Sequence, residues 1–130
     1  MASTRRLSVG VMVGGLTAVG LALTAVLLAR RVWPAYAAAE PTKAYSLVML
    51  VSRLTAGSLC TAGAAAVTTV VARDRGQAAW WLGGLFLAIS LPHHVFQVWA
   101  DYPVWYHVVY LSYLVPIAGL TGRIVQRRAG

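Results

Sequence analysis

Four long apolar stretches constrain this chain more than any other feature. They cover residues 7–29, 44–72, 78–100 and 104–122, and Arg53 is the only Lys, Arg, Asp or Glu inside them. About 20 apolar residues in a helix cross a hydrocarbon core of about 30 Å. Lipid offers no hydrogen-bond partner to the backbone, so stretches of this length must be helical. We therefore expect an all-α fold, a four-helix transmembrane bundle that forms one polytopic domain over residues 1–130.

The composition agrees with a membrane protein. The 130 residues are 59% hydrophobic and only 11% charged, which is too few charges for the surface of a soluble domain. The connections at residues 30–43, 73–77 and 101–103 leave no room for one. The first stretch follows Arg5 and Arg6 like a secretory signal, with small residues at positions 37–39. Its apolar core exceeds the usual ~7–15 residues, so we expect a retained anchor.

The basic residues predict the orientation of the chain. Three of them flank the 30–43 connection, namely Arg30, Arg31 and Lys43. Seven flank the opposite side: Arg5, Arg6, Arg73, Arg75, Arg123, Arg127 and Arg128. Because cytoplasmic loops carry the excess of Lys and Arg, we expect a multi-pass cell membrane protein with both termini in the cytoplasm. The net charge of +8 is then explained by contacts with anionic lipid headgroups, and no nucleic acid partner is expected.

The first two stretches are rich in small residues. Gly10, Gly14 and Ala18 are spaced four apart, and residues 56–66 contain several Ala and Gly. Small residues at this spacing let helices approach closely within a membrane. We expect the first two helices to pack tightly, or to offer a docking face to another subunit.

A polar stripe runs along the third stretch. At about 100° per residue, Ser90, His93, His94, Gln97 and Asp101 fall within an arc of roughly 100°. Polar groups at membrane depth usually face the bundle interior or a water-filled cavity. The stripe therefore predicts a functional site, and Pro92 predicts a kink beside it.

The fourth stretch supplies a facing stripe of tyrosines. Tyr106, Tyr110 and Tyr113 repeat at i, i+4 and i+7, so they share one helix face. The short link at 101–103 makes the last two helices a hairpin, which puts His94 and Tyr110 each about 10 Å below it. His107 lies about 6 Å below the link, and Arg53 about 14 Å into the second stretch on the same side. We expect one polar and aromatic pocket in the outer half of the bundle.

This residue set favours acid–base chemistry on a hydrophobic substrate. Histidine moves protons near neutral pH, and a tyrosine can donate to a developing oxyanion. The predicted catalytic residues are His94, His93 and Tyr110. The predicted substrate contacts are Arg53, Gln97, Asp101, His107 and Tyr113.

Metal and haem are the other chemistries that three histidines allow. His94 and Asp101 are seven residues apart and the sequence has no HxxxH pattern, so no metal site is expected. Haem held between His94 and His107 is permitted by the number of histidines, and nothing else in the sequence supports it. We expect no cofactor.

The segment Leu91-Pro92-His93-His94-Val95-Phe96, on the third of four short stretches, resembles the small DoxX-like four-helix membrane proteins of bacteria. The resemblance implies a compact bundle and no particular activity. The four-span layout is also similar to the sterol-isomerase-like EXPERA bundle. The paired acidic residues of that family are absent here, so its activity is not implied.

Two functional hypotheses follow. The first is a small membrane protein that binds a hydrophobic small molecule in the outer-leaflet pocket, with acid–base transformation of that molecule as its further step. The alternative is a noncatalytic accessory or assembly subunit of a larger membrane complex. Membrane lipids are expected partners in both, and a homodimer is a further arrangement in which a transport path would be enclosed.

Overall fold

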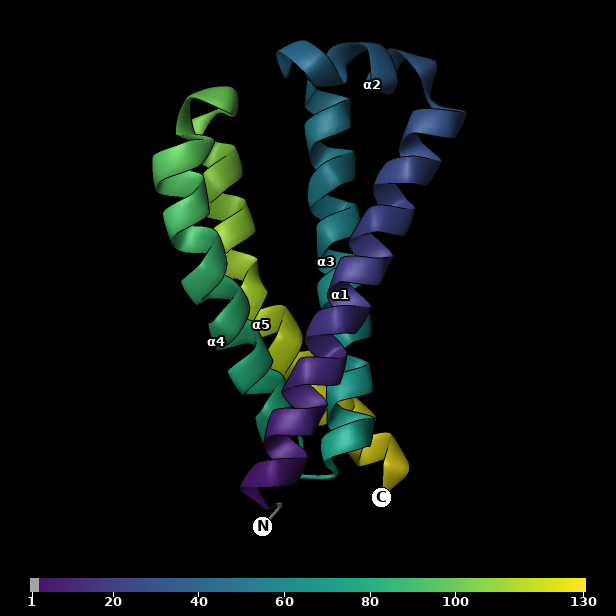
Figure 1. The fold of residues 1–130 in the computed structure, drawn as a ribbon, viewed down its shortest axis with the longest axis vertical. Coiled ribbons are helices and arrows are strands. Elements are labelled where there is room, and N and C mark those ends of the chain that lie inside the picture. The colour runs from purple at the N-terminus through teal and green to yellow at the C-terminus, as the bar shows by residue number, and fades with distance from the viewer. Residues whose placement is uncertain (1–2) are drawn as a thin grey trace.

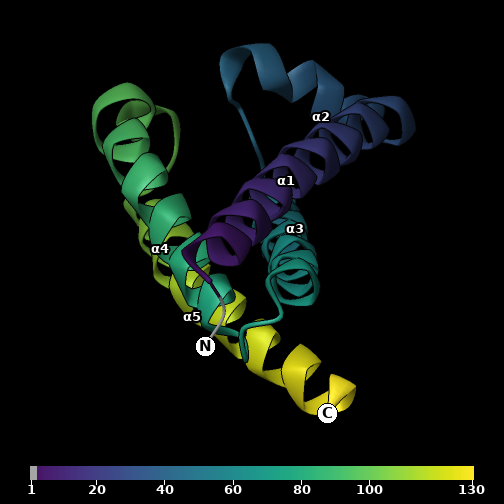
Figure 2. The ribbon, with the colours of Figure 1, turned by 60° about the horizontal axis from the view of Figure 1, so that its bottom comes forward.

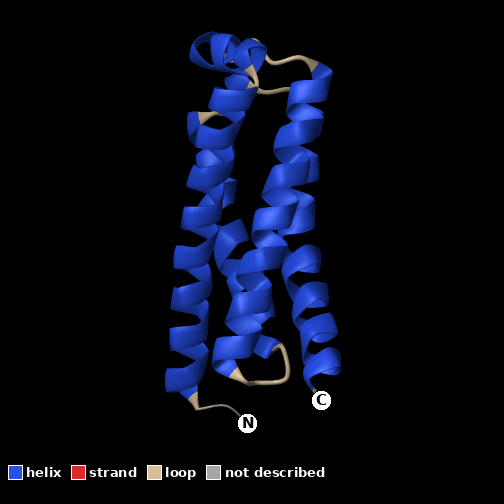
Figure 3. Cartoon of the chain, turned by 90° about the vertical axis from the view of Figure 1, so that its right-hand side faces the viewer, coloured by secondary structure: helices blue, strands red, loops and turns tan. Residues whose placement is uncertain are grey.

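The computed structural model describes residues 3–130, and within this range the chain consists of helices and short links (Figures 1 and 3). The four long helices are α1 (Thr4–Val32), α3 (Leu47–Ala72), α4 (Gln77–Pro92) and α5 (Val104–Ala129). Each is long and apolar enough to cross a membrane, α4 when the helical turn up to Gln97 is included. The predicted all-α, four-helix fold is therefore confirmed.

The third span ends earlier than predicted. After Pro92 the chain makes a π-helical turn, η2 (His93–Gln97), and then a 3-10 turn, η3 (Trp99–Asp101). The N–H of Val98 donates to the carbonyl of His93 at 3.2 Å, which is the i to i+5 bond of a π-helix. Proline has no N–H for the regular ladder, so the helix changes its winding beside it. The irregularity lies at Pro92, where a kink was predicted, and the span continues through η2 to Gln97, three residues short of the predicted end at residue 100.

The 30–43 connection also contains structure that was not predicted. It forms a short helix, α2 (Pro34–Ala39), and a 3-10 turn, η1 (Glu40–Thr42). Pro34 occupies the first helical turn, where its missing N–H has no consequence. The Ser46 side chain then accepts a hydrogen bond from the N–H of Met49 and caps α3. This segment lies across one end of the molecule, at the top of Figure 1.

The long helices form two arms. α1 packs along α3, α4 packs along α5, and α3 also packs on α5. The arms converge at the end that holds both termini and diverge toward α2 and the α4–α5 link, as Figures 1 and 2 show. The molecule is therefore closely packed at one end and open at the other.

Small residues make the convergent end tight. A Cβ atom on residue 14 would lie 1.7 Å from Thr68 Oγ1, and one on residue 122 would lie 2.5 Å from the Cβ of Ala79. The core beside them is built mostly of alanines, with Ala64, Ala65, Ala79, Leu82 and Ala118 fully buried. The predicted close packing of the first two spans is found at this end only, where α4 and α5 are equally close, and α1 and α3 diverge toward α2. Because Gly10 and Gly14 face α3 of the same chain, that face is not free to dock another subunit.

Candidate functional site

A cleft of about 560 Å³ lies between the two arms in their diverging half. This volume is typical of small-molecule sites, which span about 300–1,000 Å³. Its α1 wall is lined by small apolar residues that include Ala18, Ala22, Ala25, Val26 and Ala29. The opposite walls come from α3, α4 and α5 and include Arg53, Ala56, Gly57, Cys60, Phe86, Ser90, Tyr106, Tyr110 and Leu114. The cleft is thus a mostly apolar channel with one cationic side chain in its wall.

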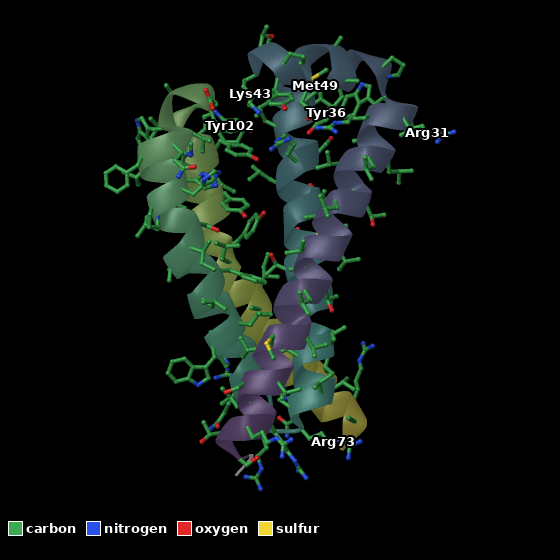
Figure 4. The ribbon with its side chains drawn as sticks, viewed as in Figure 1. Arg31, Tyr36, Lys43, Met49, Arg73 and Tyr102 are labelled. Atoms are coloured by element: carbon green, nitrogen blue, oxygen red, sulfur yellow. The ribbon has the colours of Figure 1, made fainter. Side chains whose placement is uncertain are left out.

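Arg53 is held by three tyrosine hydroxyls from three different elements. Its Nε donates to the hydroxyl of Tyr106 on α5 at 3.3 Å, and its Nη2 donates to that of Tyr102 in the α4–α5 link at 3.1 Å. Its Nη1 donates to the hydroxyl of Tyr36 on α2. We call Arg53, Tyr36, Tyr102 and Tyr106 the Arg53 cage. Figure 4 shows Tyr36 and Tyr102 near the open end, one from each arm.

Aromatic rings surround the guanidinium as well. The ring centroids of Tyr45 and Tyr102 lie 5.0 and 5.4 Å from its central carbon, which is the range of cation–π contacts. The rings of Tyr45 and Tyr102 are themselves parallel, with centroids 6.0 Å apart. Burial raises the pKa of Tyr45 and of Tyr102 above the ordinary value of a phenol. Both hydroxyls therefore keep their protons at neutral pH.

His94 and His107 form a second polar pair beside the cleft. Their Nδ1 atoms lie 2.7 Å apart, and His107 Nε2 lies 3.0 Å from the carbonyl oxygen of Trp99. A carbonyl only accepts, so His107 Nε2 carries its proton and the Nδ1 of neutral His107 is an acceptor. His94 must then donate through Nδ1, which leaves a lone pair on its Nε2. The protonation pattern of the pair is thus fixed by one backbone carbonyl.

This histidine pair lies behind the cleft wall. The His94 ring stacks on Tyr110 with centroids 4.6 Å apart and lies 6.5 Å from the ring of Tyr106. Tyr106 and Tyr110 line the cleft, whereas His94 and His107 do not. His107 is completely buried and does not line the cleft, so its predicted role as a substrate contact stays a prediction that the geometry does not support.

The predicted polar stripe divides between two faces. His94 is buried, but His93, Gln97 and Asp101 are exposed, and His93 Nδ1 lies 2.9 Å from the side-chain oxygen of Gln97. None of these three lines the cleft. The π-helical turn has a wider winding than the 100° step used for the prediction, so the residues after Pro92 point in other directions. The prediction that all of them face one pocket is wrong.

Tyr113 lies one turn deeper than Tyr110, and their ring centroids are 5.4 Å apart. Its hydroxyl is buried and has no hydrogen-bond partner among the described residues. It lies against Gly57, where a Cβ atom would approach the hydroxyl oxygen to 2.4 Å. A side chain at position 57 would therefore displace the Tyr113 hydroxyl, and Tyr113 supports the wall of the cleft without lining it.

The sequence interpretation missed Tyr36 and Tyr45 and did not pair Tyr102 with Arg53. The signal that points to them is their position: residues 33–45 contain three aromatic side chains, at the same end as Arg53. Aromatic residues at that position are typical of a membrane interface, so the sequence alone did not indicate a specific contact with Arg53.

Residues 3–130 contain no group of three His, Cys, Asp or Glu side chains placed to hold a metal ion. Since both ring nitrogens of His107 are engaged, haem binding between His94 and His107 would require their hydrogen bond to break.

No protein-family model, no curated protein and no solved structure matches this chain. The DoxX-like resemblance of residues 91–96 therefore stays a prediction.

Proposed function

We propose that this chain is a multi-pass cell membrane protein that binds a hydrophobic small molecule in the cleft between its two arms. The observation that carries the proposal is the cleft itself, a channel of ligand-sized volume with alanine and valine walls and a single charged end at Arg53. Apolar walls with a few placed polar groups are the usual composition of small-molecule sites. Membrane lipids are the natural source of such a molecule.

The proposed orientation puts the cleft in the outer leaflet. The convergent end carries the two termini and the link between α3 and α4, where seven of the arginines lie. The divergent end carries Arg30, Arg31 and Lys43. This asymmetry supports cytoplasmic termini by the positive-inside rule.

Binding is better supported than turnover. A general acid or base acts within hydrogen-bond reach of its substrate, about 2.6–3.2 Å, or through one water. Tyr110 lines the cleft and fits that requirement, but His94 contacts the cleft wall only from behind. Acid–base chemistry by His94 therefore needs a relay or a rearrangement, whereas ligand binding needs neither.

Photo-crosslinking of the purified chain in lipid nanodiscs tests this proposal. The probe is a hexadecanol derivative that carries a diazirine, and the labelled positions are mapped by mass spectrometry. We expect labels on α1 near Ala22 and Ala25 and on α3 near Ala56. Ala25→Phe fills the cleft and should reduce this labelling at least about fivefold, because a bulky ring and the probe cannot share the space.

Leu27→Phe is the matched control, because Leu27 is exposed on α1 and does not line the cleft. Its labelling should equal that of the unmodified chain. Should Ala25→Phe fail to fold, Ala22→Leu narrows the same wall at an exposed position. Equal labelling of lipid-facing positions such as Leu23, unchanged by either cleft variant, would contradict ligand binding.

A further inference from the structure

Arg53 has no acidic partner within the bundle. The chain contains only three acidic side chains. Glu40 is paired with Arg30, and Asp74 accepts hydrogen bonds from the backbone of Gly76 and Ala78 at the opposite end. Asp101 is exposed in the link. No carboxylate in residues 3–130 forms an ion pair with Arg53; Glu40, which pairs with Arg30, acts on it only through space.

Arg53 also lies far enough along α3 for its charge to be inside the membrane-spanning part of the helix. It follows the first residue of α3, Leu47, by six positions, which corresponds to about 9 Å along the helix axis. Ionisable side chains inside a membrane are costly, and they normally pair or mark a ligand path. A side chain that is charged, unpaired and exposed to a cleft at this depth favours an anion as its partner.

The hydrogen bonds of the Arg53 cage leave several donors unused. A guanidinium has five N–H groups, and three of them donate to the hydroxyl oxygens of Tyr36, Tyr102 and Tyr106. Each hydroxyl accepts from Arg53, so its own hydrogen remains available to a further acceptor. Two guanidinium N–H groups remain as well. A cluster of hydrogen-bond donors around one positive charge is complementary to an oxyanion, since charge-assisted bonds are the stronger ones.

The rest of the cleft fits one hydrocarbon chain. Its α1 wall from Ala18 to Ala29 extends about 16 Å along the helix, close to the ~15 Å thickness of one leaflet. Arg53 lies toward the α2 end of the cleft, where headgroups lie in a bilayer, and the alanine-lined part runs toward the middle. A lipid that binds in this way would keep the orientation that it has in the membrane.

We propose that the cleft binds an anionic single-chain amphiphile, with its carboxylate or phosphate group in the Arg53 cage and its acyl chain along α1. The inference rests on the proposed ligand-binding function and names the chemical class of the ligand. Carboxylate and phosphate share the required oxyanion chemistry. The experiment distinguishes them.

The test is competition against the hexadecanol photoprobe in the same nanodiscs. The competitors are palmitate, hexadecyl phosphate, hexadecanol and hexadecyltrimethylammonium, which have the same chain length and differ in charge. We expect the two anions to compete at least about tenfold better than hexadecanol, a difference of ~1.4 kcal/mol. The cation should compete worst. The stronger anion identifies the headgroup as carboxylate or phosphate.

Variants of the cage give the sharper comparison. Arg53→Gln should remove the preference for anions and leave competition by hexadecanol in place. Tyr36→Phe deletes one donor of the cage that lines the cleft, and it should lower the preference about threefold, a loss typical of one hydrogen bond. Arg31→Gln is the matched control, because Arg31 is exposed at the same end and points away from the cleft (Figure 4). Its preference should be unchanged.

The outcomes separate the two proposals. If hexadecanol competes as well as palmitate and hexadecyl phosphate, the cleft binds ligands but the anionic class is wrong. If none of the four compounds competes, the proposed function itself is wrong. Should Arg53→Gln fail to fold, Tyr36→Phe carries the test, and an unchanged preference in that variant contradicts the role of the cage.

Discussion

His94 and His107 are joined by a hydrogen bond between their Nδ1 atoms, 2.7 Å apart, and this bond ties the π-helical turn to α5. Both side chains are buried, and His107 also donates to the carbonyl of Trp99. The pair holds together a region where the regular helix of the third span has ended. Its first expected role is therefore to stabilise the open end of the bundle.

His107→Ala should lower the free energy of unfolding by about 1–3 kcal/mol, because it leaves the buried Nδ1–H of His94 and the Trp99 carbonyl without a partner. His93→Ala is the control. His93 is exposed, so its removal should change the stability by less than about 0.5 kcal/mol. Unfolding in mixed micelles with a denaturing detergent measures both. Equal stability of the two variants would show that the buried pair contributes little.

Gly14→Ala should destabilise the bundle, whereas Gly15→Ala should not. A Cβ atom at position 14 would overlap Thr68 and approach the carbonyl of Ala64, but one at position 15 meets nothing within 4 Å. Overpacking of this kind costs about 1–3 kcal/mol, while alanine in an open helical position gains up to about 1 kcal/mol over glycine. The same unfolding assay compares the pair. A Gly14→Ala variant that is as stable as Gly15→Ala would contradict the close approach of α1 and α3.

Cysteine labelling of intact cells should place the α3–α4 link inside. Gln77→Cys in a Cys60→Ala background should resist a membrane-impermeant maleimide until the cells are opened. Thr42→Cys, exposed in the turn after α2, should react from outside. The reverse pattern would invert the orientation and put the cleft in the inner leaflet.

Acid should weaken the attachment of the α2 segment to α1. The Arg30 guanidinium donates to both carboxylate oxygens of Glu40 and lowers the pKa of that carboxyl below its ordinary 4.5. A depressed pKa means that the folded state favours the ionised carboxylate, so the pair stabilises the fold above the unfolded pKa. This contribution is lost as the pH falls through the folded pKa.

The pair is solvent-accessible, so we expect a small effect. The difference in melting temperature between the unmodified chain and Glu40→Gln should be present at neutral pH and shrink as the pH falls below 4.5 and through the lowered pKa of Glu40. A difference that grows on acidification would have the wrong sign for this pair.

The sequence predicts the spans of this fold well because hydropathy and helix length are set by the bilayer itself. The close approach of α1 and α3 was also predictable, since the spacing of Gly10 and Gly14 determines which helix face can come near another. Both features depend on the local sequence and on the apolar core of the bilayer, which is the same for every span. Neither requires knowledge of a specific contact.

The candidate site was predicted less well, for two physical reasons. The direction of each side chain after Pro92 depends on the winding of the helix, and the π-helical turn sends His93 and Gln97 away from His94. The partners of Arg53 depend on how a 14-residue connection folds back over the open end. Tyr36 becomes a partner of Arg53 only because α2 forms there. A helix of six residues is too short to show a periodic pattern in the sequence.

The origin of the three hydroxyls around Arg53 has a consequence for biosynthesis. Tyr36 is translated before Arg53, but Tyr102 and Tyr106 come about 50 residues after it. During insertion, α3 therefore enters the bilayer with an arginine that still lacks two of its three partners, at a cost of up to about 2.5–3.5 kcal/mol on insertion scales. A nascent chain without its last two helices therefore carries a charge at Arg53 that lacks two of its three hydroxyl partners. Arg53 on α3 thus gains its last two hydrogen-bond partners only when the α4–α5 link and α5 have been synthesised.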